Sequence, residues 1–504
     1  MKIKELLTKK PFYRLTNGSD KAAKYNKPMQ VDKMVYAERP LFGQCMAQAD
    51  YLEEFYPFSH RVMSEFYFPE FYNFSTEKDE KGVDVIKYHR EETFRIGSTL
   101  QCLTTVQHLV HMTGNDLHFE LTDAKVDSEI EAEFRDMQKG WLSRNGEVAL
   151  YNLVKSTDMT ADAAVVFYMQ EGKLGIRSLS YLDGDTLYPH YDPISGKEKM
   201  FARKFYDYDE DGNMIVCWVE VWDDEFLTRY KQSLTGVKGK VNRVMEIFGL
   251  EGFEIVYRKR HGFSRCPVVY FRDKNNGPVW NIVQALIDDY EVALSYLAKN
   301  SAGTALPAYK LKGDNVDVEG DPLGRIRAFT MDREDDVELL QPKGLSENYI
   351  KYIELLLNEI FQGAFIVKQP ELKSGDTPTG TMKLYYAPSL DKATNDAKEF
   401  KPAIDEMVSL FCEGWGMEHG KMTEYMRLSE RIFAWIIPFV HEDTASTIAN
   451  LVSATGAGIL SKESATEHNP YATNNEVDRI TKETKQEQQA DRLFQLTSRQ
   501  TSAT

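Results

Sequence analysis

The chain has 504 residues, 42% of them apolar, and a formal net charge of −17 at pH 7. This length exceeds one ordinary hydrophobic core, so we expect two or more domains. The negative charge excludes general binding to polyanions, because phosphates would be repelled over most of the surface, and it leaves only local or transient contacts with nucleic acid. Five cysteines without a Cys-x-x-Cys pair predict reduced thiols and no zinc site. No apolar run is long enough to predict a membrane span.

The first 150 residues are predicted to be mainly helical, with candidates at 41–68, 92–112 and 127–155. From about residue 160 short β-rich runs alternate with Gly, Asp or Pro turns, which is typical of an antiparallel sheet. The acidic run 207–212 resembles the start of a calcium loop, but the twelfth position is Trp218 rather than an acid, so we interpret it as a hairpin turn. Helices followed by an antiparallel sheet predict an α+β fold.

One long helix is predicted at about 280–300, between two β-rich runs. Its apolar residues recur at spacings of three or four, so they share one face. These residues are Ile282, Leu286, Tyr290, Leu294 and Leu297. The opposite face is polar, and solvated charge is the expected role of its acids, Asp288 among them. A second striped helix, at about 346–361, includes Ile353 and Leu357. Both stripes need a partner along their length.

The region between and after these helices alternates short strands, a loop and further helices. Short strands are expected at 303–345 and a Gly/Pro/Lys loop at 364–381. The loop carries Lys368 and Lys373, and Lys383 lies just beyond it; it is either an ordinary surface loop or a weakly basic finger that contacts phosphates transiently. In the helix predicted from 382, Pro388 kinks or splits the chain. An apolar strand at 432–440 and C-terminal helices, one capped by Ser461, complete the prediction.

Four patterns that could indicate catalysis or metal binding are weak. The run 456–462 lacks the Gly-Lys-Ser/Thr ending of a phosphate-binding loop. His108 and His111 lie three positions apart without a third ligand, so we interpret them as core or surface histidines. The motif Ser389-x-x-Lys392 lacks the rest of its catalytic set, and side chains of adjacent acids diverge. We therefore expect no enzyme activity, no metal site and no cofactor.

The order of several structural motifs resembles the portal proteins of tailed bacteriophages, specifically the Gp6-like portal family of SPP1-type phages. One group of motifs includes the runs 267–271, Asn275-Asn276, 287–290 and 309–313. A C-terminal group includes the runs 432–438, 444–452, 458–463, 469–471 and 476–480. The sequence departs from the family at 379–382, where Thr-Gly-Thr-Met replaces the usual Ser-Gly-x-Ala. The first 150 residues carry no matching motif.

The resemblance implies a portal fold with eight parts. They are a wing of N-terminal helices and antiparallel sheet at 1–276, a first stem helix at 277–302, a clip at 303–345, a second stem helix at 346–363, a tunnel loop at 364–381, a kinked tunnel helix at 382–420, a wing return strand at 421–442 and a helical crown with the C-terminal tail at 443–504.

The resemblance also implies a ring of twelve subunits at one capsid vertex of a virion, assembled in the host bacterial cytoplasm. The ring would pass double-stranded DNA during packaging and ejection. It would dock the large terminase subunit and the head–tail connector, and it would meet the major capsid and scaffolding proteins. Lys368, Lys373 and Lys383 are the expected transient DNA contacts, and the two apolar stripes are the expected subunit interface. Another virion connector or minor capsid protein, and a cytosolic enzyme with an unrecognised acid/base site, are the alternatives.

Overall fold

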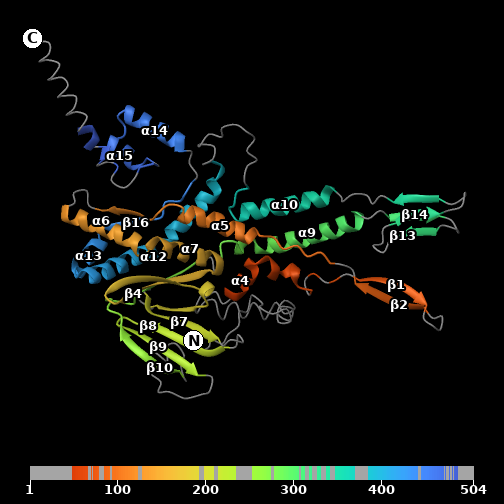
Figure 1. The fold of residues 1–504 in the computed structure, drawn as a ribbon, viewed down its shortest axis with the longest axis horizontal. Helices are drawn as coiled ribbons and strands as arrows, with labels where there is room; N and C mark the ends of the chain where they lie inside the picture. Colours follow the sequence, from red (N-terminus) through yellow and green to blue (C-terminus); the bar gives the residue numbers. More distant parts are fainter. Residues whose placement is uncertain are drawn as a thin grey trace, which may run out of the picture. The chain divides into compact units, whose positions relative to one another are not determined.

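The computed structural model describes most of the chain from residue 48 to 485 (Figure 1). The described residues are 48–65, 68, 70, 72–78, 84–90, 93–122, 128–191, 198–208, 214–233, 253–273, 277–305, 308–312, 317–320, 326–330, 336–340, 347–368, 384–440, 444–469, 471–472, 476, 479–480 and 482–485. They mix helices with mainly antiparallel strands, so the predicted α+β class is confirmed. The chain forms two compact units, one comprising residues up to 368 with 391–439, the other 369–390 with the residues from 440 onward.

Helices and one short sheet surround the main core of the first unit. The elements are α5 (Leu100–Thr113), α6 (Ser128–Ser143), α7 (Gly146–Thr160), α12 (Ala387–His419), α13 (Met422–Ser429), β3 (His118–Leu121) and β16 (Ile432–Trp435). Helix α4 (Gln48–Phe55) packs on α7, and its Tyr51 belongs to a separate cluster with Trp280. Trp141 lies at the centre of this core, 1% exposed, with its ring 5.3 Å from that of Phe411 in an edge-on contact. Aromatic pairs of this geometry add stabilisation beyond their burial. Helices far apart in the sequence are therefore joined by one apolar cluster.

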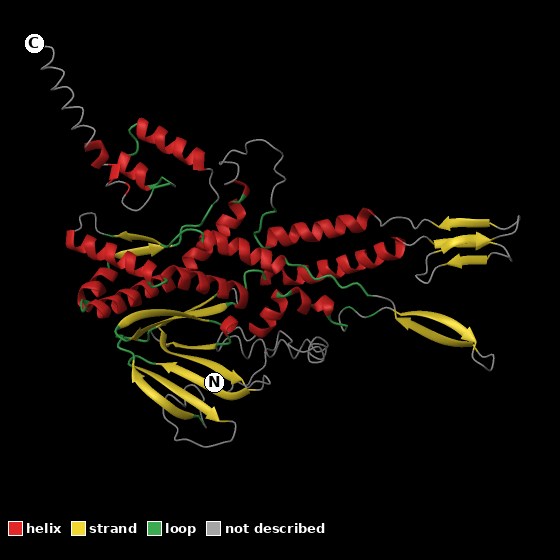
Figure 2. Ribbon diagram, viewed as in Figure 1, coloured by secondary structure: helices red, strands yellow, loops and turns green. Residues whose placement is uncertain are grey.

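Two antiparallel sheets follow the helices in the sequence (Figure 2). The three-stranded sheet has the order β11-β4-β5, from β4 (Asp162–Gln170), β5 (Lys173–Leu179) and β11 (Val268–Arg272). The five-stranded sheet has the order β10-β9-β8-β7-β6, from β6 (Thr186–Tyr191), β7 (Glu198–Tyr208), β8 (Met214–Trp222), β9 (Phe226–Ser233) and β10 (Glu254–Arg260). Phe201 and Trp222 of the larger sheet share an apolar cluster with Val166 and Val268 of the smaller. The predicted hairpin around 207–212 is confirmed, because β7 and β8 pair across it.

The remaining elements of the first unit are a helix pair, single turns of 3₁₀-helix and three hairpin-like sheets. They are α9 (Gln284–Ala305), α10 (Glu347–Gly363), η1 (Pro57–Ser59), η2 (Arg61–Met63), η3 (Tyr181–Asp183), η4 (Asn281–Val283), β1 (Tyr72–Lys78), β2 (Asp84–Arg90), β12 (Ala308–Lys312), β13 (Asp317–Gly320), β14 (Ile326–Thr330) and β15 (Asp336–Leu340). β1 pairs with β2, β12 with β15 and β13 with β14. None of the described helices is long and apolar enough to cross a membrane.

Several boundaries differ from those that the sequence predicted. The antiparallel hairpin of β1 and β2 lies in the region expected to be mainly helical. The candidate at 127–155 is two helices, because Asn145 adopts a left-handed conformation between them (φ 60°). The apolar strand expected at 432–440 ends at Trp435. Pro388 lies in the first turn of α12, where a missing N–H costs no helical hydrogen bond, and α12 continues through Pro402 to His419.

The second unit contains α14 (Thr444–Gly456) and α15 (Lys462–Glu467). α14 ends at Gly456, and Gly458 follows with φ 68°, as expected for a glycine stop. Ser461 caps α15 by accepting a hydrogen bond from the Ser464 N–H at 3.0 Å, which confirms the predicted cap.

Candidate functional site

The two striped helices pack antiparallel on each other within one chain (Figure 2). The start of α9 and the end of α10 share one apolar cluster, which includes Ile287 and Ile360. The end of α9 and the start of α10 share a second, which includes Ala293 and Ile353. The Tyr349 hydroxyl donates a hydrogen bond to the Ala293 carbonyl at 2.9 Å. The neighbour that each stripe requires is therefore the other helix of the same chain.

Six of the seven residues predicted as a subunit interface lie in this seam between α9 and α10. They are Leu286, Tyr290, Leu294, Leu297, Ile353 and Leu357. Ile282 is the exception and is 76% exposed. Other large apolar side chains of the pair also face outward, namely Tyr296, Ile350, Tyr352 and Leu355. These outward side chains are the part of the pair that is available to a second molecule.

The polar side of α9 is buried rather than solvated, which corrects the expectation for Asp288. Glu291 and Ser295 are 0% exposed. The Glu291 carboxylate lies 2.6 Å from His60 Nδ1 and accepts hydrogen bonds from the N–H and hydroxyl of Ser98, at 2.7 and 2.8 Å. Asp288 accepts a hydrogen bond from Arg61 at 2.7 Å. Buried carboxylates are tolerated because charged partners and backbone N–H groups satisfy them.

This network fixes two chain segments against α9. One comprises His60 and Arg61, and the other runs from Ile96 to Gln101, whose side-chain amide donates a hydrogen bond to Gln284 at 3.1 Å. These contacts were not predicted, although the sequence of α9 carries a signal for them. Gln284, Asp288, Glu291 and Ser295 recur at spacings of four and three, so they form a polar stripe as regular as the apolar one.

Helix α5 contacts the predicted tunnel loop near its start and also contacts the helix that follows the loop. Within the first residues of the 364–381 segment, the Val367 N–H donates a hydrogen bond to the Gln107 side chain at 3.1 Å. After the loop, Asp396 of α12 lies 3.0 Å from Nε2 of His108, the next residue of α5. Lys368 is exposed, whereas Lys373 and Lys383 lie outside the described residues. Gln107 and His108, neighbours on α5, thus contact the start of the loop segment and the following helix α12.

His108 is a buried cation between two carboxylates. Its Nδ1 lies 2.8 Å from Asp158 and its Nε2 faces Asp396, which also pairs with Lys392. Burial alone would lower the pKa of His108, but the charges and hydrogen bonds of Asp158 and Asp396 outweigh it and raise the pKa to about 9. His111 makes a 2.8 Å hydrogen bond to the Phe439 carbonyl. Both histidines are therefore core residues, and no three His, Cys, Asp or Glu side chains converge as metal ligands within the described ranges.

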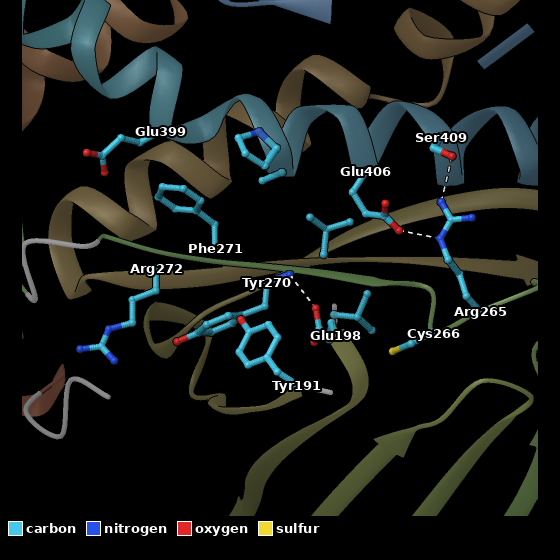
Figure 3. A pocket seen from close by; sticks show the side chains of 14 residues that line it. Tyr191, Glu198, Arg265, Cys266, Tyr270, Phe271, Arg272, Glu399, Glu406 and Ser409 are labelled. Carbon is cyan, nitrogen blue, oxygen red and sulfur yellow. Dashed lines mark hydrogen bonds and ion pairs between the residues drawn. The ribbon is translucent and has the colours of Figure 1, made fainter. Parts of the chain in front are cut away.

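A hollow of about 750 Å³ lies between β11 and α12 (Figure 3). Arg265 and Arg272 both line it, and the Arg265 guanidinium donates hydrogen bonds to Glu406 at 2.6 Å and to Ser409 at 2.9 Å. Burial raises the pKa of Glu198 and that of the Cys266 thiol well above their ordinary values. The lining therefore combines an arginine paired with Glu406 and a carboxyl and a thiol whose charged forms are disfavoured by burial.

No curated protein matches the chain. A solved structure described as "Neck of empty GTA particle computed with C6 symmetry" is similar, with a TM-score of 0.40 and 10% identity; the match covers 73% of this chain and 88% of that chain. The family model described as "Phage portal protein, SPP1 Gp6-like" matches residues 103–490, which is more than half of the chain. The chain therefore belongs to the SPP1 Gp6-like family of phage portal proteins.

Proposed function

We propose that the chain forms a closed ring of twelve subunits at one vertex of a phage capsid. The ring is a channel through which double-stranded DNA is packaged and ejected. It also docks the large terminase subunit and the head–tail connector, and it contacts the major capsid and scaffolding proteins. The observation that carries this proposal is the family match over residues 103–490.

The proposed ring is built on the helix pair. α9 and α10 are assigned to the stem segments 277–302 and 346–363, and the strands β12 to β15 to the clip at 303–345. Most of the apolar stripe residues are buried between α9 and α10 of one chain. The proposed contacts between neighbouring copies are therefore the exposed side chains, namely Ile282, Tyr296, Ile350, Tyr352 and Leu355. A heterologous contact of this kind closes into a ring when its rotation is an integral fraction of a full turn.

The other segments follow the family order. The wing comprises residues 1–276 with a return strand at 421–442, the tunnel loop 364–381, the tunnel helix 382–420 and the crown 443–504. Lys368, Lys373 and Lys383 are proposed to contact DNA phosphates transiently. On a chain of net charge −17, three lysines give weak and salt-sensitive attraction, so DNA can slide without being held.

The proposed role requires no catalysis by this chain. Movement of DNA would be driven by the docked motor, and the portal would supply a passage and a platform. Mass photometry of the purified full-length chain tests the proposal. We expect one dominant species at twelve times the mass of a single chain, and a stable monomer at micromolar concentration would contradict it.

A further inference from the structure

The strands β9 and β10 carry a concentrated group of cations on an otherwise acidic chain. We call these two strands the cationic ribbon. Their sequences, FLTRYKQS and EIVYRKR, contain a single carboxylate, Glu254. The cations are Arg229, Lys231, Arg258, Lys259 and Arg260. Because the chain as a whole has a net charge of −17, this locally positive surface is where an anion would be attracted.

Among the residues that the structure describes, β10 is the edge strand of the five-stranded sheet and β9 is next to it (Figure 1). β10 is the terminal strand in the order β10-β9-β8-β7-β6, and six of its seven residues are exposed. Arg258 and Lys259 are neighbours in the regularly paired part of the strand and are both exposed, so within the described residues β10 is open on both faces. A large ligand can therefore approach the edge and either face.

Aromatic rings order the cations on both faces. On one face, the Arg258 and Arg260 guanidinium carbons lie 3.8 and 5.5 Å from the centre of the Phe226 ring. On the other face, the Arg229 guanidinium lies 5.0 Å from the Tyr257 ring. Lys231 lies 5.6 Å from the Trp218 ring. Ring contacts restrict long side chains without neutralising their charge.

Most of these charges remain available to an external anion. Arg229 pairs with the buried Glu220. Arg260 lies 3.6 Å from Glu225, but the side chains of Arg260 and Glu225 are each more than 60% exposed. Arg258, Lys259 and Lys231 have no carboxylate partner among the residues that the structure describes. Three unneutralised cations thus lie on two adjacent strands.

An alternative explanation is that the charges protect an edge strand from pairing with a strand of another molecule. That explanation requires only one or two charges of either sign. It accounts neither for five cations of one sign nor for the rings that order them. The cations also form a row rather than one pocket, which suits a repeating row of charges such as a phosphate backbone better than a single carboxylate.

We propose that the cationic ribbon binds the phosphate backbone of duplex DNA, at a site separate from the tunnel loop. This inference rests on the proposed function, in which the chain handles DNA. The contact is independent of base sequence, because the cations are aimed outward from a sheet edge and present no element shaped for reading bases.

The test is fluorescence anisotropy of the full-length chain with a duplex of about thirty base pairs, between about 50 and 200 mM salt. The variant carries Arg258→Gln, Lys259→Gln and Arg260→Gln. We expect roughly tenfold weaker binding and a salt slope smaller by about three, because each lost phosphate contact removes about one counterion from the slope. The single change Lys259→Glu, at an exposed position, replaces the triple variant if the latter fails to fold.

A matched variant removes the same charge elsewhere, with Lys139→Gln, Lys173→Gln and Lys421→Gln at exposed positions of other elements. It should bind the duplex as the unchanged chain does. Equal loss in both variants would overturn the inference, as would competition by a polyglutamate peptide at the same charge concentration as the DNA. Mass photometry of the same samples separates the two claims. Rings without ribbon-dependent binding would refute this inference alone, and ribbon-dependent binding without rings would refute the proposed function alone.

Discussion

His60 and Glu291 lie 231 positions apart in the sequence, yet His60 Nδ1 is 2.6 Å from the Glu291 carboxylate and both side chains are fully buried. The pair connects the aromatic-rich segment before β1 to the middle of α9. Ser98 completes the arrangement from a third segment by donating two hydrogen bonds to the same oxygen. Polar contacts therefore fix one side of α9 to the rest of its unit, while its other side packs on α10.

Replacing Glu291 by Ala should destabilise the fold by about 3 kcal/mol, because it leaves His60 and the Ser98 N–H without their buried partner. Glu291→Gln should cost much less. It keeps the accepting oxygen Oε1 and changes only Oε2, which has no partner among the described residues. The exposed Asp289→Ala on the same helix is the control. Urea unfolding of the three variants checks this order, and equal loss in Gln and Ala would contradict it.

His108 should make stability depend on pH in the alkaline range. Its pKa is raised from 6.5 to about 9, so its contribution is complete below about pH 6.5 and is lost as the pH rises through about 9. The groups that face it are Asp158, Asp396 and, through Asp396, Lys392. Thermal unfolding from pH 6 to pH 10 should show this decline, and His108→Asn should abolish it and cost about 3 kcal/mol at pH 7. An unchanged pH profile in the variant would refute the assignment.

Asp162 should also lower stability as the pH rises, but in the acidic range and because burial disfavours its charged form. It is 1% exposed, and burial raises its pKa to about 6 although Tyr270 donates a hydrogen bond to it at 3.0 Å. The folded protein therefore takes up a proton between the ordinary value of 3.8 and about 6, and stability falls as the pH rises through this window. Asp162→Asn should be more stable by about 2 kcal/mol at pH 7.5, with a smaller gain towards pH 4. A variant that is less stable at pH 7.5 would contradict this.

The inner and outer faces of the helix pair should respond differently to charge. Leu355 is 56% exposed, so Leu355→Asp should leave each subunit folded and prevent its assembly. Leu286 packs in the seam, so Leu286→Asp should lower the unfolding temperature itself by burying an unpaired charge. Circular dichroism combined with analytical ultracentrifugation distinguishes the two effects. Unimpaired assembly of Leu355→Asp would show that this face lies outside the subunit interface.

The tunnel-loop lysines should affect DNA passage without affecting assembly. Changing Lys368, Lys373 and Lys383 to Ala removes three cations proposed to contact phosphates, so rings should form normally while the salt dependence of DNA packaging or retention decreases. A packaging assay at two ionic strengths, with ring formation measured in parallel, checks this. Loss of ring formation would place these lysines at a structural contact instead.

Periodic features of the sequence predicted the fold where local patterns are strong. The stripe beginning at Leu286, the hairpin around 207–212 and the Ser461 cap were all recognisable, because helix spacing, turn residues and caps act within a few positions. The hairpin of β1 and β2 was missed, since its strands are largely polar and lack a clear apolar alternation. The break at Asn145 was missed although the sequence marks it, because Asn145-Gly146 is a turn dipeptide and Asn adopts the left-handed conformation more readily than most residues.

The long-range contacts of the candidate site could not be predicted. The partner of Glu291 is 231 positions away, and that of His108 in α12 is equally invisible to local patterns. The polar stripe of α9 can be recognised in the sequence, but its burial cannot be predicted from it. Polar residues are usually solvated, and only the tertiary fold supplies His60, Arg61 and Ser98 as partners.

Electron microscopy of the purified full-length chain tests the central claim, that this chain is the subunit of a portal ring. We expect closed rings in end-on views, with rotational symmetry and a central opening wide enough for duplex DNA. Solid single-subunit particles without an axial opening, at concentrations where the protein is folded, would contradict it.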